Sequence, residues 1–371
     1  MPQTPLGPLV SRDLRPAPPV LFSRPVDRVW LMMLFTKKKS RSRAAHEATA
    51  APLKATVSFI AMGTMMRFCA YGAQAQRFLE NAEATTVELD RLLSVFSPHS
   101  EVSQLNEADG AWIELSAHTA AVLSEACDYS AQTDGTYDLA IGTLVNLWSA
   151  SKQAGVVPTP EDIAQALAPC SYRTIERDEQ GRFRLLNGAR VDLGGIGKGY
   201  AADVLCAQAR QAGVSAALFS LGTSSVGAWG EKPDGSPWKV GLKTATTADI
   251  ATYGTVCLRD RFLSSSGDWE QCFVKGGRRY HHILDKSSGY PADTGLRSVA
   301  VIADSGAQSE AYSTALFVMG LDDALAFYRQ RGDFEAVFLT SDRQVIATPK
   351  ISTSFEFTGE DMGYHLLPYN Y

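Results

Sequence analysis

Short stretches rich in alternating apolar and β-branched residues occur along most of the chain, and this pattern is typical of β-strands. Residues 56–62 are the first such stretch. Residues 182–193 alternate around Asn187 and Gly188, a dipeptide that favours a tight turn, and they therefore predict a hairpin. Further strands are predicted at residues 217–221, 238–242, 255–258, 298–302 and 336–340.

Other segments place apolar residues three or four positions apart, which predicts helices with one buried face. Residues 73–93 show this spacing clearly, with acidic residues between Phe78 and Leu89. Thr159 can cap a helix whose first position is Pro160, because the N–H that proline lacks would be unpaired there in any case. Helices are predicted at residues 73–93, 116–133, 198–212, 309–318 and 321–331, with one more that opens at Pro160.

The order of these elements determines the expected fold class. Strands and helices follow one another without the strict alternation of parallel β–α–β units, and several strands are joined by short turns. This order favours an α+β fold with mixed or antiparallel sheets and helices packed on them. No linker-like segment interrupts the chain after residue 56, so we expect one large domain over residues 56–371.

The first 55 residues differ in composition from the rest. Residues 1–30 contain seven prolines, and a short apolar run at residues 29–35 is followed by a cluster of lysine and arginine. Such a proline-rich and basic tail predicts disorder. A signal peptide is not favoured, because the charges follow the apolar run instead of preceding it. No cysteine follows this run until Cys69, which argues against a lipid anchor, and Met32 or Met33 is an alternative start.

Composition then narrows the class of protein. The 371 residues are 45% hydrophobic and 20% charged, with a formal net charge of −5. This acidic balance argues against binding of nucleic acid, which requires a basic surface. No apolar run approaches the ~18–20 residues of a transmembrane span. The six cysteines form no C-x-x-C pair, which argues against zinc and thioredoxin-type sites and favours free thiols in a reducing compartment.

The segment from Val191 to Asp203 has the pattern of a strand, a glycine-rich turn and a helix. Two common phosphate-binding patterns fail here, because Gly199 replaces the Ser or Thr of the P-loop and Tyr200 replaces the third glycine of the dinucleotide fingerprint. Even so, glycines allow a ligand to approach, and a helix start presents free N–H groups to an anion. A cation in the first turn opposes the helix dipole, so Lys198 indicates either an anionic ligand or a solvated side chain beside a tight turn.

Two adjacent histidines, His281 and His282, follow a glycine hairpin at residues 275–278. If they continue a strand, their side chains point to opposite faces, so at most one of them can join a given site. A structural or surface histidine is the common alternative. The spacing from His282 to Asp285 does not match a metal-ligand pattern.

Residues 309–318 combine an apolar helix with polar residues near its start. Glu310 and Thr314 are four positions apart and share one face of the helix, and Ser313 lies beside them. Carboxylate and hydroxyl oxygens suit a hard cation such as Mg²⁺. The alternative is that Ser309 caps the helix and Glu310 lies in its first turn, where an acidic residue is favourable.

These segments, taken together and in this order, resemble the ApbE-like FAD:protein FMN transferases. The resemblance extends over residues 62–355 and rests on short motifs. They are Met62-Gly63-Thr64, residues 93–106, residues 137–148, residues 192–203, Ser220-Leu221-Gly222, Ser265-Ser266-Gly267, residues 282–289 and Ser313-Thr314-Ala315-Leu316.

The resemblance implies a catalytic domain that binds FAD and Mg²⁺, releases AMP, and attaches FMN through a phosphoester bond to a Ser or Thr hydroxyl of an acceptor flavoprotein domain. Carried over to this sequence, it places His282 at the reacting phosphate as the catalytic residue. It implies FAD contacts at Met62, Phe96, Thr136, Tyr137, Asp138, Asp192, Lys198 and Leu284. It implies metal ligands at Gly195, Glu310, Ser313 and Thr314.

Some positions depart from the family pattern. Glu310 stands where aspartate is usual, and Ser313 stands where a second aspartate is frequent, so binding of Mg²⁺ is expected to be weakened. Lys286 stands where proline is expected. Two alternatives therefore stay open: an FAD pyrophosphatase that yields FMN and AMP, and a non-catalytic FAD-binding relative. Many bacterial members are exported, whereas the tail here favours a cytoplasmic location and leaves export open.

Overall fold

A nine-stranded sheet forms the centre of the part of the chain that the computed structural model describes, residues 53–244 and 251–369. Its order is β1-β2-β5-β6-β9-β12-β13-β14-β16, and all neighbours are antiparallel except the parallel pair β14–β16. The strands are β1 (Lys54–Ala61), β2 (Thr64–Tyr71), β5 (Ala216–Leu221), β6 (Ser225–Trp229), β9 (Phe262–Gly267), β12 (Leu296–Ala303), β13 (Glu335–Thr340), β14 (Gln344–Ala347) and β16 (His365–Leu367). This arrangement confirms the predicted α+β class.

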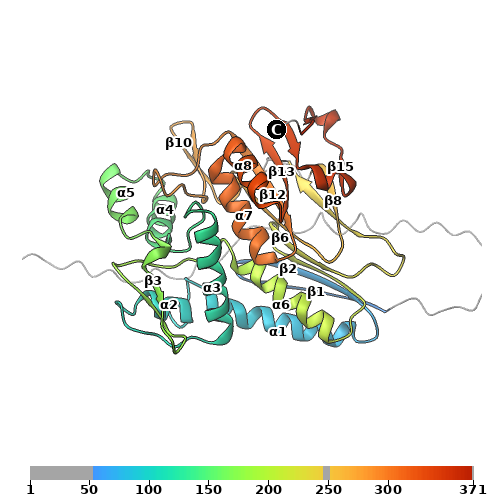
Figure 1. The fold of residues 1–371 in the computed structure, drawn as a ribbon, viewed down its shortest axis with the longest axis horizontal. Helices are drawn as coiled ribbons and strands as arrows, with labels where there is room; N and C mark the ends of the chain where they lie inside the picture. Colours follow the sequence, from blue (N-terminus) through green and yellow to red (C-terminus); the bar gives the residue numbers. More distant parts are fainter. Residues whose placement is uncertain (1–52, 245–250, 370–371) are drawn as a thin grey trace, which may run out of the picture. The chain divides into compact units, whose positions relative to one another are not determined.

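Helices cover one face of the large sheet (Figure 1). They are α1 (Ala75–Leu93), α6 (Gly197–Gln211), α7 (Gly306–Met319) and α8 (Leu321–Arg331). Phe68 and Phe219 on neighbouring strands meet edge to face, 5.3 Å apart between ring centroids. Phe78 of α1 packs on Phe219 at 5.9 Å. Removing these rings from water stabilises the layer of helices on the sheet.

A smaller sheet of β7 (Trp238–Lys243), β8 (Thr252–Leu258) and β15 (Phe355–Phe357) covers the opposite face. Strand β12 contributes to both cores: Val299 and Val301 pack in the core that includes α7 and α8, whereas Ala300 and Ile302 pack with residues of the smaller sheet. Because both faces of β12 are buried, its residues 299–303 are all apolar instead of alternating with polar ones.

Smaller elements lie beside the large sheet (Figure 1). They are α2 (Glu101–Asn106), α3 (Ala117–Gln132), α4 (Gly142–Ala154), α5 (Pro160–Leu167), the 3₁₀ turn η1 (Tyr172–Thr174), β3 (Ile175–Arg177), β4 (Phe183–Leu185), and the hairpin of β10 (Phe273–Lys275) and β11 (Arg278–Tyr280). The 3₁₀ turns η2 (Pro349–Thr353) and η3 (Glu360–Met362) lie near the C-terminus of the chain. Helix α5 begins as predicted, because Thr159 accepts a hydrogen bond from the Asp162 N–H.

Two local predictions are wrong. Asn187 and Gly188 adopt positive φ angles of 58° and 72°, as a tight turn requires. However, residues 189–196 are described and form no strand, and β4 pairs with β3 instead. Helix α7 begins at Gly306, and Ser305 is its cap in place of Ser309. Glu310 therefore lies beyond the first turn of the helix.

Residues 1–52 of the predicted disordered tail lie outside the described residues, and β1 begins at Lys54. Residues 53–244 and 251–369 belong to one compact unit. Among the helices of the described ranges, none is long and apolar enough to cross a membrane. The six cysteines are free thiols.

Candidate active site

The glycine-rich turn leads into α6 at the point where this helix meets α7. A Cβ atom at Gly199 would lie 2.1 Å from the carbonyl oxygen of Gly306, so only glycine allows this contact. Further along α6, the Asp203 carboxylate accepts the N–H groups of Gly306 and Ala307 at 2.7 and 2.9 Å. Helix α6 thereby fixes the start of α7 and the direction of the side chains that follow it.

Glu310 lies at the centre of the contacts between α6, α7 and β6, with 5% of the residue exposed. One carboxylate oxygen accepts the N–H of Gly199 at 2.6 Å, and the other accepts the hydroxyl of Ser225 at 3.1 Å. The ammonium group of Lys198 forms an ion pair with the same carboxylate. The alternative in which Ser309 caps α7 and Glu310 serves the first turn is wrong, because Glu310 bonds to other elements. The structure thus brings together Lys198 and Glu310, two residues that the sequence analysis predicted for the site.

Serine hydroxyls line the contact between β9 and α7. Ser264 and Ser266 are two positions apart on β9 and therefore point to the same face. They meet Ser309 and Ser313, one turn apart on α7, with hydroxyl oxygens 2.9 and 3.0 Å apart. The Thr314 hydroxyl lies 3.4 Å from that of Ser266. Ser313 and Thr314 therefore share one polar cluster with Ser266.

Tyr137 and Asp192 flank the glycine turn. A Cβ atom at Gly195 would lie 3.1 Å from the Tyr137 ring and 3.7 Å from the Thr314 hydroxyl oxygen, so these three residues adjoin. Asp192 accepts the N–H of Gly194 at 2.7 Å, which closes the turn. Burial raises the pKa of Asp192. Burial also raises the pKa of Tyr137 well above its ordinary value, and neighbouring carboxylates add to this effect on Tyr137. The Tyr137 hydroxyl is buried and has no hydrogen-bond partner among the described residues.

Asp138 is buried and its carboxylate is already engaged. One oxygen accepts the N–H of Ala140 at 2.9 Å, and the other accepts the N–H of Tyr172 at 3.1 Å and the Lys286 ammonium at 2.6 Å. The pair of Asp138 and Lys286 joins the segment between α3 and α4 to the loop that carries His282. These contacts give Asp138 a structural role, and its contact with FAD stays a prediction.

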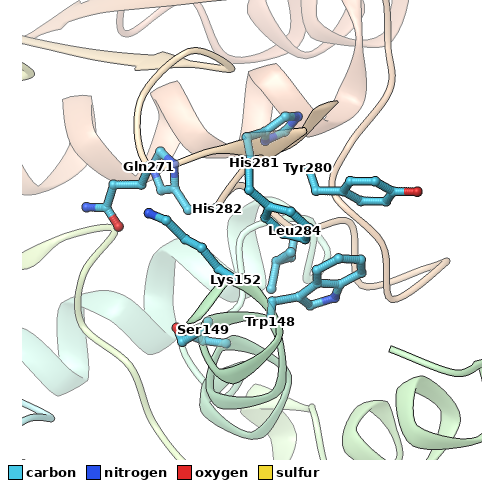
Figure 2. A pocket seen from close by; sticks show the side chains of 10 residues that line it. Trp148, Ser149, Lys152, Gln271, Tyr280, His281, His282 and Leu284 are labelled. Carbon is cyan, nitrogen blue, oxygen red and sulfur yellow. The ribbon is translucent and has the colours of Figure 1, made fainter. Parts of the chain in front are cut away.

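A cavity of about 50 Å³ opens between α4 and the loop after β11 (Figure 2). Tyr280 stacks with Trp148 and with Phe273, at 5.5 and 5.2 Å between ring centroids. Figure 2 shows Lys152 and Gln271 beside His282. The cavity is lined by Val145, Trp148, Ser149, Lys152, Gln271, Phe273, Tyr280, His281, His282 and Leu284.

The two histidines follow β11 instead of continuing it, so the strand argument for their directions does not apply. His281 is buried, with Nε2 2.9 Å from the carbonyl oxygen of Ala292. His282 is exposed, and its Nδ1 lies 3.1 Å from the carbonyl oxygen of Glu270. That carbonyl can only accept, so Nδ1 donates and Nε2 carries the free electron pair of the neutral ring. Loss of water around the ring lowers the pKa of His282 to about 4, which leaves it neutral at pH 7.

The remaining predicted contacts are more scattered. Leu284 is buried in the wall of the His282 cavity. Met62 lies in the turn between β1 and β2, and Phe96 is 90% exposed in the loop between α1 and α2. Within the part of the chain that is described, neither residue shares a hydrogen bond, ion pair or ring contact with the Glu310 cluster. The contacts of Met62, Phe96 and Thr136 with FAD stay predictions.

Sequence analysis missed the roles of Ser225, Ser266 and Lys286. Ser225 and Ser266 lie on neighbouring strands of the large sheet, and only in the folded chain does Ser225 meet Glu310 and Ser266 meet Ser313. The serines of residues 264–266 give a weak signal, because polar residues in a central strand need partners when they are buried. No spacing rule connects Lys286 with Asp138, which is far away in the sequence.

The oxygen atoms around Glu310 constitute a candidate site for a hard cation. In residues 53–244 and 251–369, no group of three or more His, Cys, Asp and Glu side chains could hold a metal. The site offers one carboxylate with the hydroxyls of Ser313 and Thr314 and the backbone of Gly195 nearby. Mg²⁺ is commonly held by one or two carboxylates together with substrate phosphates. This donor set could serve an Mg²⁺ ion that shares a bound phosphate, and the predicted metal ligands Gly195, Glu310, Ser313 and Thr314 stay a prediction.

Comparison with known proteins identifies relatives of this chain. A protein of Klebsiella pneumoniae (strain 342) named FAD:protein FMN transferase is 34% identical over 280 residues, which cover 74% of this chain and 85% of that protein. A protein of Escherichia coli (strain K12) with the same name is 30% identical, with 73% of this chain and 80% of that protein covered.

Solved structures show the same relationship. The ApbE protein of Thermotoga maritima has a TM-score of 0.76 at 27% identity and covers 81% of this chain and 99% of its own. The apo form of the Pseudomonas stutzeri flavinyl transferase ApbE has a TM-score of 0.71 at 28% identity, with 81% and 95% covered. The sequence profile of the ApbE family matches residues 62–338, and the chain belongs to this family.

Proposed function

We propose that this protein transfers FMN from FAD to a Ser or Thr hydroxyl of an acceptor protein and releases AMP. The observation that carries the proposal is the buried pair of Lys198 and Glu310 at the start of α6, beside a hydroxyl cluster. The names of the relatives, FAD:protein FMN transferase, support the same chemistry.

The FAD pyrophosphate would bind at the glycine-rich turn. The first N–H groups of a helix lack partners within the helix and attract anions, and Gly197 begins α6 at this point. Lys198 adds a positive charge within the same turn. The Tyr137 hydroxyl, which has no partner among the described residues, provides a further buried donor.

In the transfer step, the acceptor hydroxyl oxygen forms a bond to the phosphorus of the FMN group. The bond from this phosphorus to the oxygen of AMP breaks, and AMP leaves with the electron pair. The proton of the acceptor hydroxyl passes to Nε2 of His282, the ring nitrogen that carries the free electron pair. Positioning and neutralisation of charge supply most of the acceleration in phosphoryl transfer.

A divalent metal fits this scheme. Glu310, Ser313, Thr314 and the carbonyl oxygen of Gly195 would hold Mg²⁺, which when bound neutralises charge on the pyrophosphate. Lys198 would neutralise further negative charge on the pyrophosphate. Ser225 and the Gly199 N–H orient the Glu310 side chain, as they already do in this structure.

The test combines the purified protein with FAD, Mg²⁺ and a small acceptor flavoprotein domain. Intact mass spectrometry of the acceptor and chromatography of free AMP are the readouts. We expect one FMN on the acceptor for each AMP released, and neither product when the acceptor Ser or Thr is changed to Ala. FMN and AMP in equal amounts without acceptor would indicate a pyrophosphatase, and FAD binding with no AMP would indicate a non-catalytic protein. Either result would overturn the proposal.

A further inference from the structure

Lys198 places a positive charge at a position of α6 where a cation is unfavourable. It is the second residue of α6, where the helix dipole disfavours a cation. Its side chain is only 20% exposed, and that of its partner Glu310 is 7% exposed. A weak hydrogen bond to the carbonyl oxygen of Gly194, at 3.4 Å, and the charge of the Asp192 carboxylate also act on it. Glu310 is its direct ion-pair partner.

Both oxygens of the Glu310 carboxylate are engaged in this arrangement. Oε2 accepts the N–H of Gly199 at 2.6 Å, while Oε1 accepts Ser225 at 3.1 Å and contacts the Lys198 ammonium. A divalent cation could use Oε1 only if the ammonium withdrew. The charges of the pair also cancel, so the site presents little net attraction to a metal.

The neighbouring oxygens do not change this balance. Ser313 donates to the carbonyl oxygen of Glu310 at 2.9 Å and lies 3.0 Å from the Ser266 hydroxyl. Thr314 belongs to the same neutral cluster. Hydroxyl groups contribute weak ligands to Mg²⁺, whereas the number of carboxylates largely sets its affinity.

We propose that Lys198 is the internal counter-ion of the metal site and that FAD displaces it from Glu310. In the free protein the ammonium occupies the carboxylate and keeps metal affinity low. When the pyrophosphate arrives, Lys198 exchanges its carboxylate partner for a phosphate oxygen, and Glu310 becomes available to the cation. The inference rests on the proposed function and adds to it an exchange mechanism that couples metal binding to FAD binding. By linkage, the metal then increases FAD affinity by the same factor as FAD increases metal affinity.

The test is a titration of Mg²⁺ or Mn²⁺ into the FAD-free protein by calorimetry. Lys198→Met removes the charge, and Lys198→Gln removes the charge but keeps a hydrogen-bond donor for the buried carboxylate. Both variants should bind metal about tenfold more tightly than the wild type, and the gain in metal affinity on adding FAD should shrink by a similar factor, within the range of ordinary coupling energies. Lys239→Met is the matched control, because Lys239 pairs with Glu356 at the surface, 3.7 Å apart, and its loss should leave metal affinity unchanged.

Thermal unfolding guards against a variant that folds poorly. Mg²⁺ without FAD should raise the melting temperature of Lys198→Met more than that of the wild type, because a ligand that binds only the folded state stabilises it. Adding Glu310→Gln to Lys198→Met should remove this gain. Unchanged or weaker metal binding in both Lys198 variants would overturn the exchange mechanism. If the wild type nevertheless transfers FMN, the proposed function survives that result. If metal affinity rises but no FMN transfer occurs under any condition, the exchange stands and the proposed function fails.

Discussion

Replacing Lys286 by methionine tests whether the loop that carries His282 is anchored by charge. Its ammonium lies 2.6 Å from Oδ2 of Asp138, whose side chain is completely buried. Losing one partner of a buried pair costs about 3–5 kcal/mol, because the remaining charge stays desolvated. Here two backbone N–H groups, those of Ala140 and Tyr172, still bond to the carboxylate. We therefore expect a loss of about 2–3 kcal/mol in the free energy of unfolding.

Urea unfolding followed by circular dichroism measures this loss, and a thermal scan should show a decrease of roughly 3–5 °C in melting temperature. Lys275→Met is the control, because Lys275 is exposed on β10 and has no ion pair among the described residues. A loss below about 0.5 kcal/mol in Lys286→Met would refute the reasoning, because it would mean that the two N–H groups suffice to hold the carboxylate.

Three further changes test other parts of the structure. Gly199→Ala should lower the free energy of unfolding in urea by about 1–3 kcal/mol, because the new Cβ would collide with the Gly306 carbonyl oxygen. The Cβ of Gly197→Ala would meet no atom within 4 Å, so this variant should be tolerated, and equal effects of the two changes would argue against the close helix contact. Burial and nearby carboxylates raise the pKa of Glu125 from 4.5 to about 7, so the folded state loses stability as the pH rises through this interval. Glu125→Gln should therefore increase the free energy of unfolding by roughly 1 kcal/mol at pH 8 and by almost nothing at pH 4. The same increase at both pH values would exclude titration as the cause. His282→Ala should lower the rate of FMN transfer by about 10²–10⁴-fold with little change in melting temperature, whereas His281→Ala should chiefly lower the melting temperature. In the wild type the rate of transfer should fall only as the pH approaches 4, and a step near pH 6.5 would contradict the lowered pKa of His282.

The sequence predicted elements well where local signals were sufficient. The N-terminus of α5 followed from Thr159 and Pro160, and α8 ends at Arg331 as its periodicity indicated. The start of α7 was wrong because Ser305 caps this helix and accepts the N–H of Gln308, a local Ser-x-x-Gln signal that the sequence analysis missed. Asp203 of α6 also holds this turn, and that contact leaves no mark in the local sequence. The second strand expected after Gly188 failed for a similar reason, since β4 had a partner earlier in the chain.

The candidate site shows the same limit. Lys198, Glu310, Ser313 and Thr314 were identified from local patterns and from the family resemblance, and the structure places them in one cluster. Their partners Ser225 and Ser266 come from strands that reach the cluster only through the order of the large sheet. The ion pair of Lys198 with Glu310 could not be foreseen, because the crossing of α6 and α7 depends on the close contact at Gly199.

The most direct measurement of the central claim is a crystal structure of the protein with FAD and Mg²⁺. The account predicts the pyrophosphate at the N-terminus of α6, with Lys198 bonded to a phosphate oxygen and Glu310 released from Lys198 and bound to the metal. A structure with the phosphates bound away from the turn at residues 192–198, and with the pair of Lys198 and Glu310 intact, would contradict it.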